Sequence, residues 1–190
     1  MPCIAKKHEA NRKEMQDIDG IKDVDLVITT RELAKIIKEA GIDIVNLHDS
    51  EFDNPLGMSS GAGTIFGTSG GVMEAALRTA YEWITGKELE KIDFENVRGL
   101  EGIKEAKVDL NGKEVNVAVV SSLGNAKKIM DEIKYGNSKY HFIEVMACPG
   151  GCIDGGGQPF IKSNRDVLKK RMNAISVSYT HLTLPTIYSV

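Results

Sequence analysis

Three cysteines are the residues of this sequence whose type and spacing could do chemistry. Cys148 and Cys152 lie four positions apart, and Cys3 lies close to the first residue. An odd number of cysteines does not suit a disulfide framework and indicates a reducing compartment. Five of the eight residues from 150 to 157 are glycines. A buried structural cysteine needs no such surroundings, so we interpret the thiols as ligands for a soft metal or an iron-sulfur cluster.

A zinc site is the first alternative. Structural zinc takes four ligands in a tetrahedron, and its cysteines are commonly paired as Cys-x2-Cys. The three-residue spacer between Cys148 and Cys152 is less typical of zinc. Glycines beside the ligands leave space for a group larger than a metal ion and let backbone N–H groups point at its sulfides. The pattern therefore favours iron and sulfur.

A lysine and a glutamate follow the first cysteine at regular intervals. Lys6 comes three residues after Cys3, and Glu9 comes three residues after Lys6. On a helix these three residues share one face. An ammonium buried beside a cluster needs an anionic partner, so we expect Lys6 to have one.

Two longer motifs contain these residues. Residues 1–9 read MPCIAKKHE, and residues 144–159 read EVMACPGGCIDGGGQP. They match MPCxxKxxE and ExMACxxGCxxGGGQP, which are signatures of the iron-only ([FeFe]) hydrogenases. The segment from 60 to 78 also resembles the part of that family that lies between the two signatures. The chain to about residue 175 therefore resembles the H-cluster domain in the C-terminal portion of the hydrogenase large subunit.

The resemblance implies a fold, a cofactor and a reaction. The implied fold class is α/β, with two lobes of parallel or mixed sheets flanked by helices and the H-cluster between them. That cofactor is a 4Fe-4S cluster joined through one cysteine to a di-iron subcluster with CO, CN and a bridging dithiolate. The implied activity is the reversible reduction of protons to H2.

The resemblance also implies roles for single residues. Cys3 and Cys148 are expected to ligate the cubane, while Cys152 ligates it and bridges to the di-iron subcluster. Lys6 is expected to donate a hydrogen bond to a cyanide, with Glu9 supporting it. Cys152 and Lys6 are therefore the candidate catalytic residues. The other residues expected at the cofactor are Met1, Phe66, Gly67 and Met146.

The sequence departs from the family in its upstream part. A TSCCP-type motif, which in the family supplies the remaining cubane ligand and a proton-passing cysteine, is absent, as are ferredoxin-like cysteine clusters. Met1 also coincides with a methionine that is internal in the family motif. We therefore expect residues 1–176 to be part of the C-terminal domain of the large subunit and to be inactive alone. Residues 177–190 resemble a translated sequencing adaptor and are expected not to be native, the alternative being a genuine C-terminal strand.

The resemblance implies partners as well as chemistry. These are protons and H2, an electron carrier that is ferredoxin or an NAD(P)-linked subunit, and the hydrogenase maturation proteins. A non-catalytic cytosolic iron-sulfur assembly factor, similar to prelamin-A recognition factor, shares much of both signatures and is the alternative function. A hydrogen-sensing member and a generic α/β domain with free thiols are further alternatives.

Composition excludes other classes of protein. The chain has 190 residues and 24 basic against 27 acidic side chains, which gives a formal net charge of −3. This balance does not suit a nucleic-acid protein driven by basicity, so no nucleic-acid partner is expected. No apolar stretch approaches the roughly 20 residues that cross a bilayer, and residues 1–9 do not suit a signal peptide. We therefore expect a cytoplasmic protein that has no membrane partner. The resemblance to the hydrogenases further implies an anaerobic, electron-transferring system.

Alternating strands and helices are predicted to position the motifs. Strands are expected at 24–28 and 140–146, and Asn111-Gly112 predicts a hairpin that joins 106–110 to 114–120. Helices are expected at 32–40, 71–85, 125–133 and 165–174. The first helix has Thr29 or Thr30 as its cap and ends at Gly41.

Glycine-rich segments lie between these elements. Eleven of the 19 glycines fall within 57–71 and 150–157, which indicates unusual backbone dihedrals or a close approach to a ligand. The segment before residue 71 offers backbone N–H groups at a helix start, a position that suits an anion. The GxGxxxG spacing of 61–67 misses the dinucleotide fingerprint. His48-Asp49-Ser50 cannot form a catalytic triad from adjacent positions and is interpreted as a loop.

Overall fold

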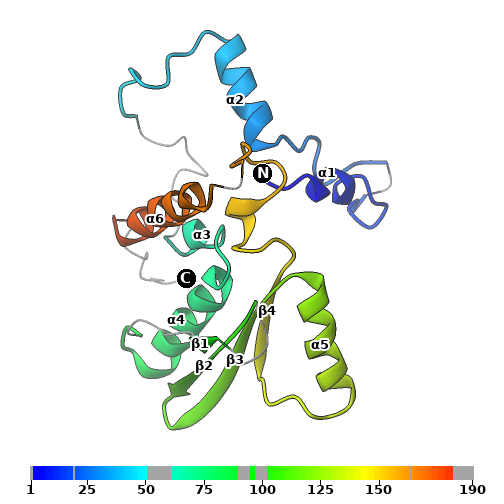
Figure 1. The fold of residues 1–190 in the computed structure, drawn as a ribbon, viewed down its shortest axis with the longest axis vertical. Helices are drawn as coiled ribbons and strands as arrows, with labels where there is room; N and C mark the ends of the chain where they lie inside the picture. The colour runs from blue at the N-terminus through cyan, green and yellow to red at the C-terminus, as the bar shows by residue number, and fades with distance from the viewer. Residues whose placement is uncertain are drawn as a thin grey trace. The chain divides into compact units, whose positions relative to one another are not determined.

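The computed structural model describes residues 2–18, 20–50, 61–89, 95–96, 102–162 and 164–181. The chain divides into two compact units (Figure 1). The first unit contains residues 1–59 and 153–168, and the second contains residues 60–152 and 169–190. The expected division into two lobes matches this arrangement, and each unit is described by itself below.

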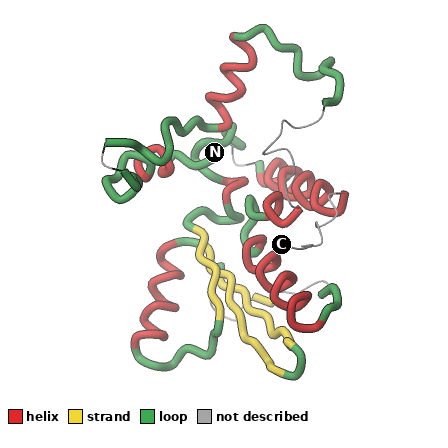
Figure 2. Tube along the Cα trace, turned by 180° about the vertical axis from the view of Figure 1, so that it is seen from behind, coloured by secondary structure: helices red, strands yellow, loops and turns green. Residues whose placement is uncertain are grey.

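The second unit contains a mixed four-stranded sheet (Figure 2). Its strands, in spatial order, are β1 (Glu95–Asn96), β2 (Ile103–Leu110), β3 (Lys113–Ser121) and β4 (Phe142–Met146). The pairs β1/β2 and β2/β3 are antiparallel, whereas β3/β4 is parallel. A mixed sheet flanked by helices confirms the predicted α/β class.

The predicted hairpin is confirmed at Asn111 and Gly112. Both residues have positive φ, 55° and 87°, and Leu110 pairs with Lys113 across the turn. Two consecutive residues with positive φ match the twist of antiparallel strands, which is why Asn-Gly is the preferred dipeptide there. The strands extend beyond the predicted ranges because pairing continues to Ile103 in β2 and to Lys113 and Ser121 in β3.

Helices cover both faces of the sheet. They are α4 (Gly71–Thr85) and α5 (Leu123–Lys134), while the short helix α3 (Gly61–Ile65) packs against α4. Side chains alternate along a strand, so neighbouring residues face opposite sides of the sheet. Val117 and Val119 of β3 pack with Met73 and Leu77 of α4. Ala118 and Val120 pack instead with Ile129 of α5. The predicted helices of this unit are therefore confirmed, with α4 at the predicted bounds.

The first unit is built around the start of the chain and the glycine-rich segment after Cys152. It contains α1 (Ala5–Glu9) and α2 (Thr30–Glu39). Thr29 caps α2: its hydroxyl accepts from the N–H of Glu32, whose carboxylate accepts from the N–H of Thr29. This reciprocal capping box confirms the predicted start of the helix. The predicted loop at residues 48–50 is also confirmed.

The strand predicted at 24–28 is wrong. The segment forms no ladder, and the isolated bridge between Ile18 and Ile21 is the only strand pairing in the described part of this unit. Val24 and Leu26 are 44% and 76% exposed. A short apolar run becomes a strand only where a neighbouring strand accepts its hydrogen bonds, and the described residues of this unit supply none.

A last helix, α6 (Arg165–His181), is longer than the predicted 165–174. It continues through residues 177–181 of the expected non-native tail, and these residues are helical rather than a strand. Residues 182–190 lie outside the described residues. None of the helices in the described part of the chain combines the length and the apolar character that spanning a bilayer requires.

Candidate functional site

Cys148 and Cys152 flank a tight turn in the second unit. The N–H of Gly151 donates to the carbonyl oxygen of Cys148 at 3.0 Å, and Gly150 has a φ of 78°. Proline followed by a residue with positive φ is typical of a type II turn, and Pro149-Gly150 fits it. The short 3-10 helix η1 (Cys152–Asp154) begins at the second cysteine. The Cys-x3-Cys spacing is thus a folded turn with a half-buried thiol at each end.

The turn packs against the loop that precedes α4. The N–H of Ser69 donates to the carbonyl oxygen of Gly150 at 3.1 Å. A Cβ atom at Gly151 would lie 2.6 Å from the nitrogen of Ser69 and 2.9 Å from the carbonyl oxygen of Gly67. Gly151 also has a φ of 90°. Glycine is therefore required here for both reasons that the sequence suggested, although the close approach observed is to another part of the chain.

Three of the predicted pocket residues lie in the same unit as this turn. Gly67 contacts it directly, as its distance from Gly151 shows. Met146 ends β4 two residues before Cys148, and its carbonyl oxygen accepts from the N–H of Ser122 at 2.8 Å. Phe66 is 45% exposed and lines an open apolar groove along α4 with Trp83.

A carboxylate occupies the start of α4, where the sequence predicted free N–H groups for an anion. Glu144 of β4 accepts from the N–H of Gly70 at 2.6 Å and from the N–H of Met73 at 2.7 Å. The Glu144 residue is only 6% exposed. The expectation of free N–H groups at this helix start is wrong, because the Glu144 carboxylate accepts from two of them. A single acidic residue inside the apolar strand FIEVM is a sequence signal for a buried carboxylate that needs partners, although it does not indicate which N–H groups these are.

Lys6 and Glu9 form an ion pair at 2.5 Å in the first unit. Their side chains are 45% and 37% exposed. The expected anionic partner of Lys6 is thus present, but in this unit the ammonium is not buried. Cys3 is half-buried and precedes α1, which begins at Ala5, so the three residues do not share one helix. Met1 lies outside the described residues.

The segment GGGQP holds the residues around Cys3. The N–H of Gly157 donates to the carbonyl oxygen of Pro2 at 2.8 Å, and a Cβ atom on Gly157 would lie 2.9 Å from the Pro2 carbonyl carbon. Arg31 donates its backbone N–H to Gly157 and its guanidinium to the carbonyl of Gln158, at 3.2 and 3.1 Å. The guanidinium also lies 4.4 Å from the ring centre of Phe160. These contacts connect the end of the second motif to the beginning of the first.

An ion pair joins the two helices of the first unit. The ammonium of Lys7 on α1 donates to the carboxylate of Glu32 on α2 at 2.5 Å. The hydrogen bond from Lys7, followed by those from the Thr29 N–H and hydroxyl, lowers the pKa of Glu32 to about 2. Glu32 therefore caps α2 and also fixes α1 against it.

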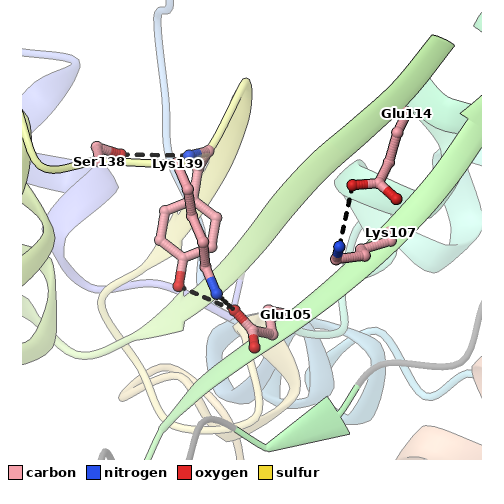
Figure 3. Close-up of polar contacts among 6 residues, drawn as sticks. Glu105, Lys107, Glu114, Ser138 and Lys139 are labelled. Carbon is pink, nitrogen blue, oxygen red and sulfur yellow. Dashed lines mark hydrogen bonds and ion pairs between the residues drawn. The ribbon is translucent and has the colours of Figure 1, made fainter.

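A separate polar cluster lies on the sheet and does not involve the cysteines (Figure 3). Glu105 contacts the ammonium of Lys139 at 2.7 Å and accepts from the Tyr140 hydroxyl at 3.2 Å. The hydrogen bond from Lys139 lowers the pKa of Glu105. Burial, and then the charge of Glu105, raises the pKa of Tyr140 to about 12. Two residues further along β2, Lys107 lies 3.0 Å from Glu114 of β3.

The donor chemistry fits an iron-sulfur cluster. All three cysteines lie in the described part of the chain, and none forms a disulfide. Cys3 belongs to the first unit, whereas Cys148 and Cys152 belong to the second. Among the described residues, no group of three or more His, Cys, Asp or Glu side chains is gathered to hold a metal ion. The three cysteines carry thiols, and thiolates are the ligands that iron-sulfur clusters take.

Comparison with known proteins identifies a family. Residues 1–156 match the family model of the iron-only hydrogenase large subunit, C-terminal domain. The chain is similar to the NADP-reducing hydrogenase subunit HndD of Solidesulfovibrio fructosivorans, with 53% identity over 92% of this chain and 30% of that protein. It is also similar to the periplasmic iron hydrogenase large subunit of Nitratidesulfovibrio vulgaris, with 57% identity over 84% of this chain and 38% of that protein.

Solved structures agree with this assignment. An [FeFe]-hydrogenase variant from Chlamydomonas reinhardtii shares 40% sequence identity with a TM-score of 0.72, covering 92% of this chain and 51% of that chain. The expected cofactor is confirmed for the family, because other matched hydrogenase structures concern H-cluster assembly and degradation of its two-iron subcluster. Assembly factors are less similar: a probable cytosolic Fe-S cluster assembly factor of Dictyostelium discoideum is 36% identical over 88% of this chain and 35% of that protein.

The chain spans about a third of the length of the curated hydrogenases and about half of the length of the solved chain that it matches. The family match includes all three cysteines and covers most of the 190 residues. The chain belongs to the iron-only ([FeFe]) hydrogenase family, within the C-terminal domain of the large subunit.

Proposed function

We propose that this chain is part of an [FeFe] hydrogenase that reversibly reduces protons to H2 at an H-cluster. The observation that carries the proposal is the family match over residues 1–156, which includes all three cysteines, the whole first motif and the second motif up to Gly156. The hydrogenases that the chain resembles are 53% and 57% identical to it. The Dictyostelium discoideum assembly factor is 36% identical, so the assembly-factor function is the weaker candidate.

The cysteines have separate roles in this proposal. Cys3 and Cys148 ligate the 4Fe-4S cubane, and Cys152 ligates it and bridges to the di-iron subcluster. When bound, the H-cluster would pass on the electrons that the carrier delivers and would supply the iron site at which protons and H2 are interconverted. The hydrogen bond between Cys148 and Gly151 fixes the backbone between the two thiolates, and the Ser69 contact holds that backbone in place. The chain thereby sets the spacing of two ligands before any cluster binds.

Lys6 acts in the proposal as a cationic hydrogen-bond donor to an anionic cyanide of the cofactor. A lysine ammonium is a compact charge with three donors, so it can keep Glu9 as a partner and still donate elsewhere. Glu9 lies 2.5 Å from it and limits the directions that the ammonium can take. Met1, Phe66, Gly67 and Met146 complete the proposed surroundings of the cofactor.

The remaining ligand and the electron route come from outside these 190 residues in our proposal. The chain has three cysteines, whereas the resemblance implies a fourth cubane ligand and a proton-passing cysteine. We therefore expect no H2 evolution from the chain alone. Ferredoxin or an NAD(P)-linked subunit is the proposed electron carrier, and hydrogenase maturation proteins supply the di-iron subcluster. A cytoplasmic location stays a prediction, since one matched relative is periplasmic.

Cluster binding by the chain itself can be tested directly. The purified chain is incubated without oxygen with iron and sulfide, and bound iron and the electron paramagnetic resonance spectrum of the reduced sample are measured. We expect an iron-sulfur signal that is lost in Cys148→Ser and Cys152→Ser. Lys7→Met is the control, since Lys7 contacts Glu32 and not a cysteine. An iron content that is equally low in all four proteins would contradict cluster binding.

A chimera tests the activity. Residues 1–156 replace the matching segment of the Nitratidesulfovibrio vulgaris large subunit, which supplies the rest of the hydrogenase, and the chimera is produced with maturation proteins. We expect carbonyl and cyanide infrared bands and H2 evolution from reduced viologen, both lost with Cys152→Ser. Lys6→Met is expected to lower H2 evolution strongly, while Lys7→Met preserves it. A chimera with its cubane but without these bands would support the assembly-factor function instead.

A further inference from the structure

The carboxylate of Glu144 joins two distant segments of the second unit. It lies on β4 and receives the N–H groups of Gly70 and Met73 at 2.6 and 2.7 Å. With the residue 6% exposed, each carboxylate oxygen has one backbone donor that replaces water. The positive end of the α4 dipole adds a favourable interaction with the negative charge. Glu144 therefore fixes the start of α4 to β4.

This contact continues to the cysteine turn through one residue. Gly70 follows Ser69, whose N–H donates to the carbonyl of Gly150 at 3.1 Å. The Ser69 hydroxyl lies 3.2 Å from that of Ser121 on β3, which holds the same loop from the other side. Because Gly151 has no Cβ, the turn and the loop are in close contact along this stretch. A displacement of Gly70 would therefore move the loop that supports the turn.

We propose that Glu144 is a positioning residue for Cys148 and Cys152. Its carboxylate holds the loop before α4 in the position at which Ser69 can bind Gly150, and this fixes the backbone between the two thiols. The proposal rests on the proposed function only in treating these cysteines as cluster ligands. A glutamine cannot replace the carboxylate, because its amide nitrogen is a donor and would face one of the two backbone N–H groups.

Thiol reactivity in the metal-free chain tests the inference without any cofactor. The reduced, chelator-treated chain is exposed to iodoacetamide, and the alkylation rate of each cysteine is followed by mass spectrometry. In Glu144→Gln we expect Cys148 and Cys152 to react roughly tenfold faster or more, as a lost charged hydrogen bond raises the local opening equilibrium. Cys3 lies in the other unit and serves as the internal reference, with an unchanged rate.

A second variant separates positioning from general destabilisation. Val117→Ala opens a cavity in the core of the same unit, where Val117 is fully buried, and it leaves the contacts of Glu144 in place. Both variants are compared at a temperature below their unfolding transitions. We expect Val117→Ala to leave the Cys148 and Cys152 rates close to those of the original chain. Equal acceleration in both variants, or none in Glu144→Gln, would overturn the inference.

Reconstitution distinguishes this inference from the proposed function. With iron and sulfide, we expect Glu144→Gln to bind less iron and to give an altered paramagnetic resonance spectrum, while Val117→Ala gives the original spectrum. An unaltered spectrum and iron content in Glu144→Gln would overturn the positioning role and leave the cluster function standing. If no protein binds iron but the alkylation rates differ as expected, the cluster function fails and the positioning of the two thiols is supported.

Discussion

The backbone N–H of Ser69 donates a 3.1 Å hydrogen bond to the carbonyl oxygen of Gly150. Ser69 lies in the loop before α4, and Gly150 lies in the turn between Cys148 and Cys152. Their contact explains the glycine at position 151, because a Cβ atom there would lie 2.6 Å from the Ser69 nitrogen. Gly151 therefore lets the loop before α4 pack against the turn that holds the two thiols.

Replacing Gly151 by alanine tests this contact. The new Cβ would lie 2.6 Å from the Ser69 nitrogen, and the φ of 90° is unfavourable for alanine. We expect Gly151→Ala to lower the free energy of unfolding of the second unit by about 2–5 kcal/mol, combining steric overlap with backbone strain. Urea denaturation followed by the fluorescence of Trp83, the only tryptophan, measures it.

Gly112→Ala is the matched control for this prediction. Gly112 has a similar φ of 87°, but nothing lies within 4 Å of a Cβ at that position. Its expected cost is the backbone strain alone, about 1–2 kcal/mol. If the two alanine variants lost equal stability, the close approach at Gly151 would not be important.

The pKa of Glu32 predicts how acid acts on the first unit. Because the Lys7 hydrogen bond lowers it from 4.5 to about 2, the charged carboxylate stabilises the folded unit above pH 4.5. That stabilisation is lost as the pH falls from 4.5 toward 2. We expect the helix melting temperature, followed by circular dichroism, to fall less steeply over this range in Glu32→Gln. Glu39→Gln on the same helix, whose Lys35 partner is exposed, is expected to preserve the original slope.

Tyr140 gives a prediction at the opposite end of the pH scale. Its pKa is raised from 10.0 to about 12, first by burial, so the neutral hydroxyl favours the folded state. This contribution is complete below pH 10 and is lost as the pH rises from 10 toward 12. The difference in tyrosinate absorbance between the original chain and Tyr140→Phe is expected to titrate near 12. Tyr135→Phe removes an exposed tyrosine instead, and its absorbance is still expected to show a tyrosine that titrates near 12.

Two leucines test the packing of the sheet. Leu77 of α4 is 4% exposed and contacts the sheet core, whereas Leu123 at the start of α5 is 69% exposed. We expect Leu77→Ala to cost about 2–5 kcal/mol in urea denaturation, because it leaves a cavity. Leu123→Ala is expected to change stability by less than about 0.5 kcal/mol. Similar costs for both would contradict the packing of α4 described above.

Local signals in the sequence determined much of this protein. Asn111-Gly112 fixed a hairpin because both residues tolerate positive φ, and Thr29 with Glu32 fixed a helix start through contacts only three residues apart. The two cysteine motifs were also sufficient to recognise the family that the comparisons confirm. Each of these features depends on neighbouring residues or on the residue types themselves.

Only the tertiary structure decided the features that depend on distant partners. The sequence alone could not show that Glu144 occupies the start of α4, since the two meet only when β4 packs beside that helix. For the same reason, residues 24–28 looked like a strand but form none, because pairing depends on a neighbour rather than on apolar composition. Buried charges and strand ladders are settled by long-range contacts, and these exist only in the folded chain.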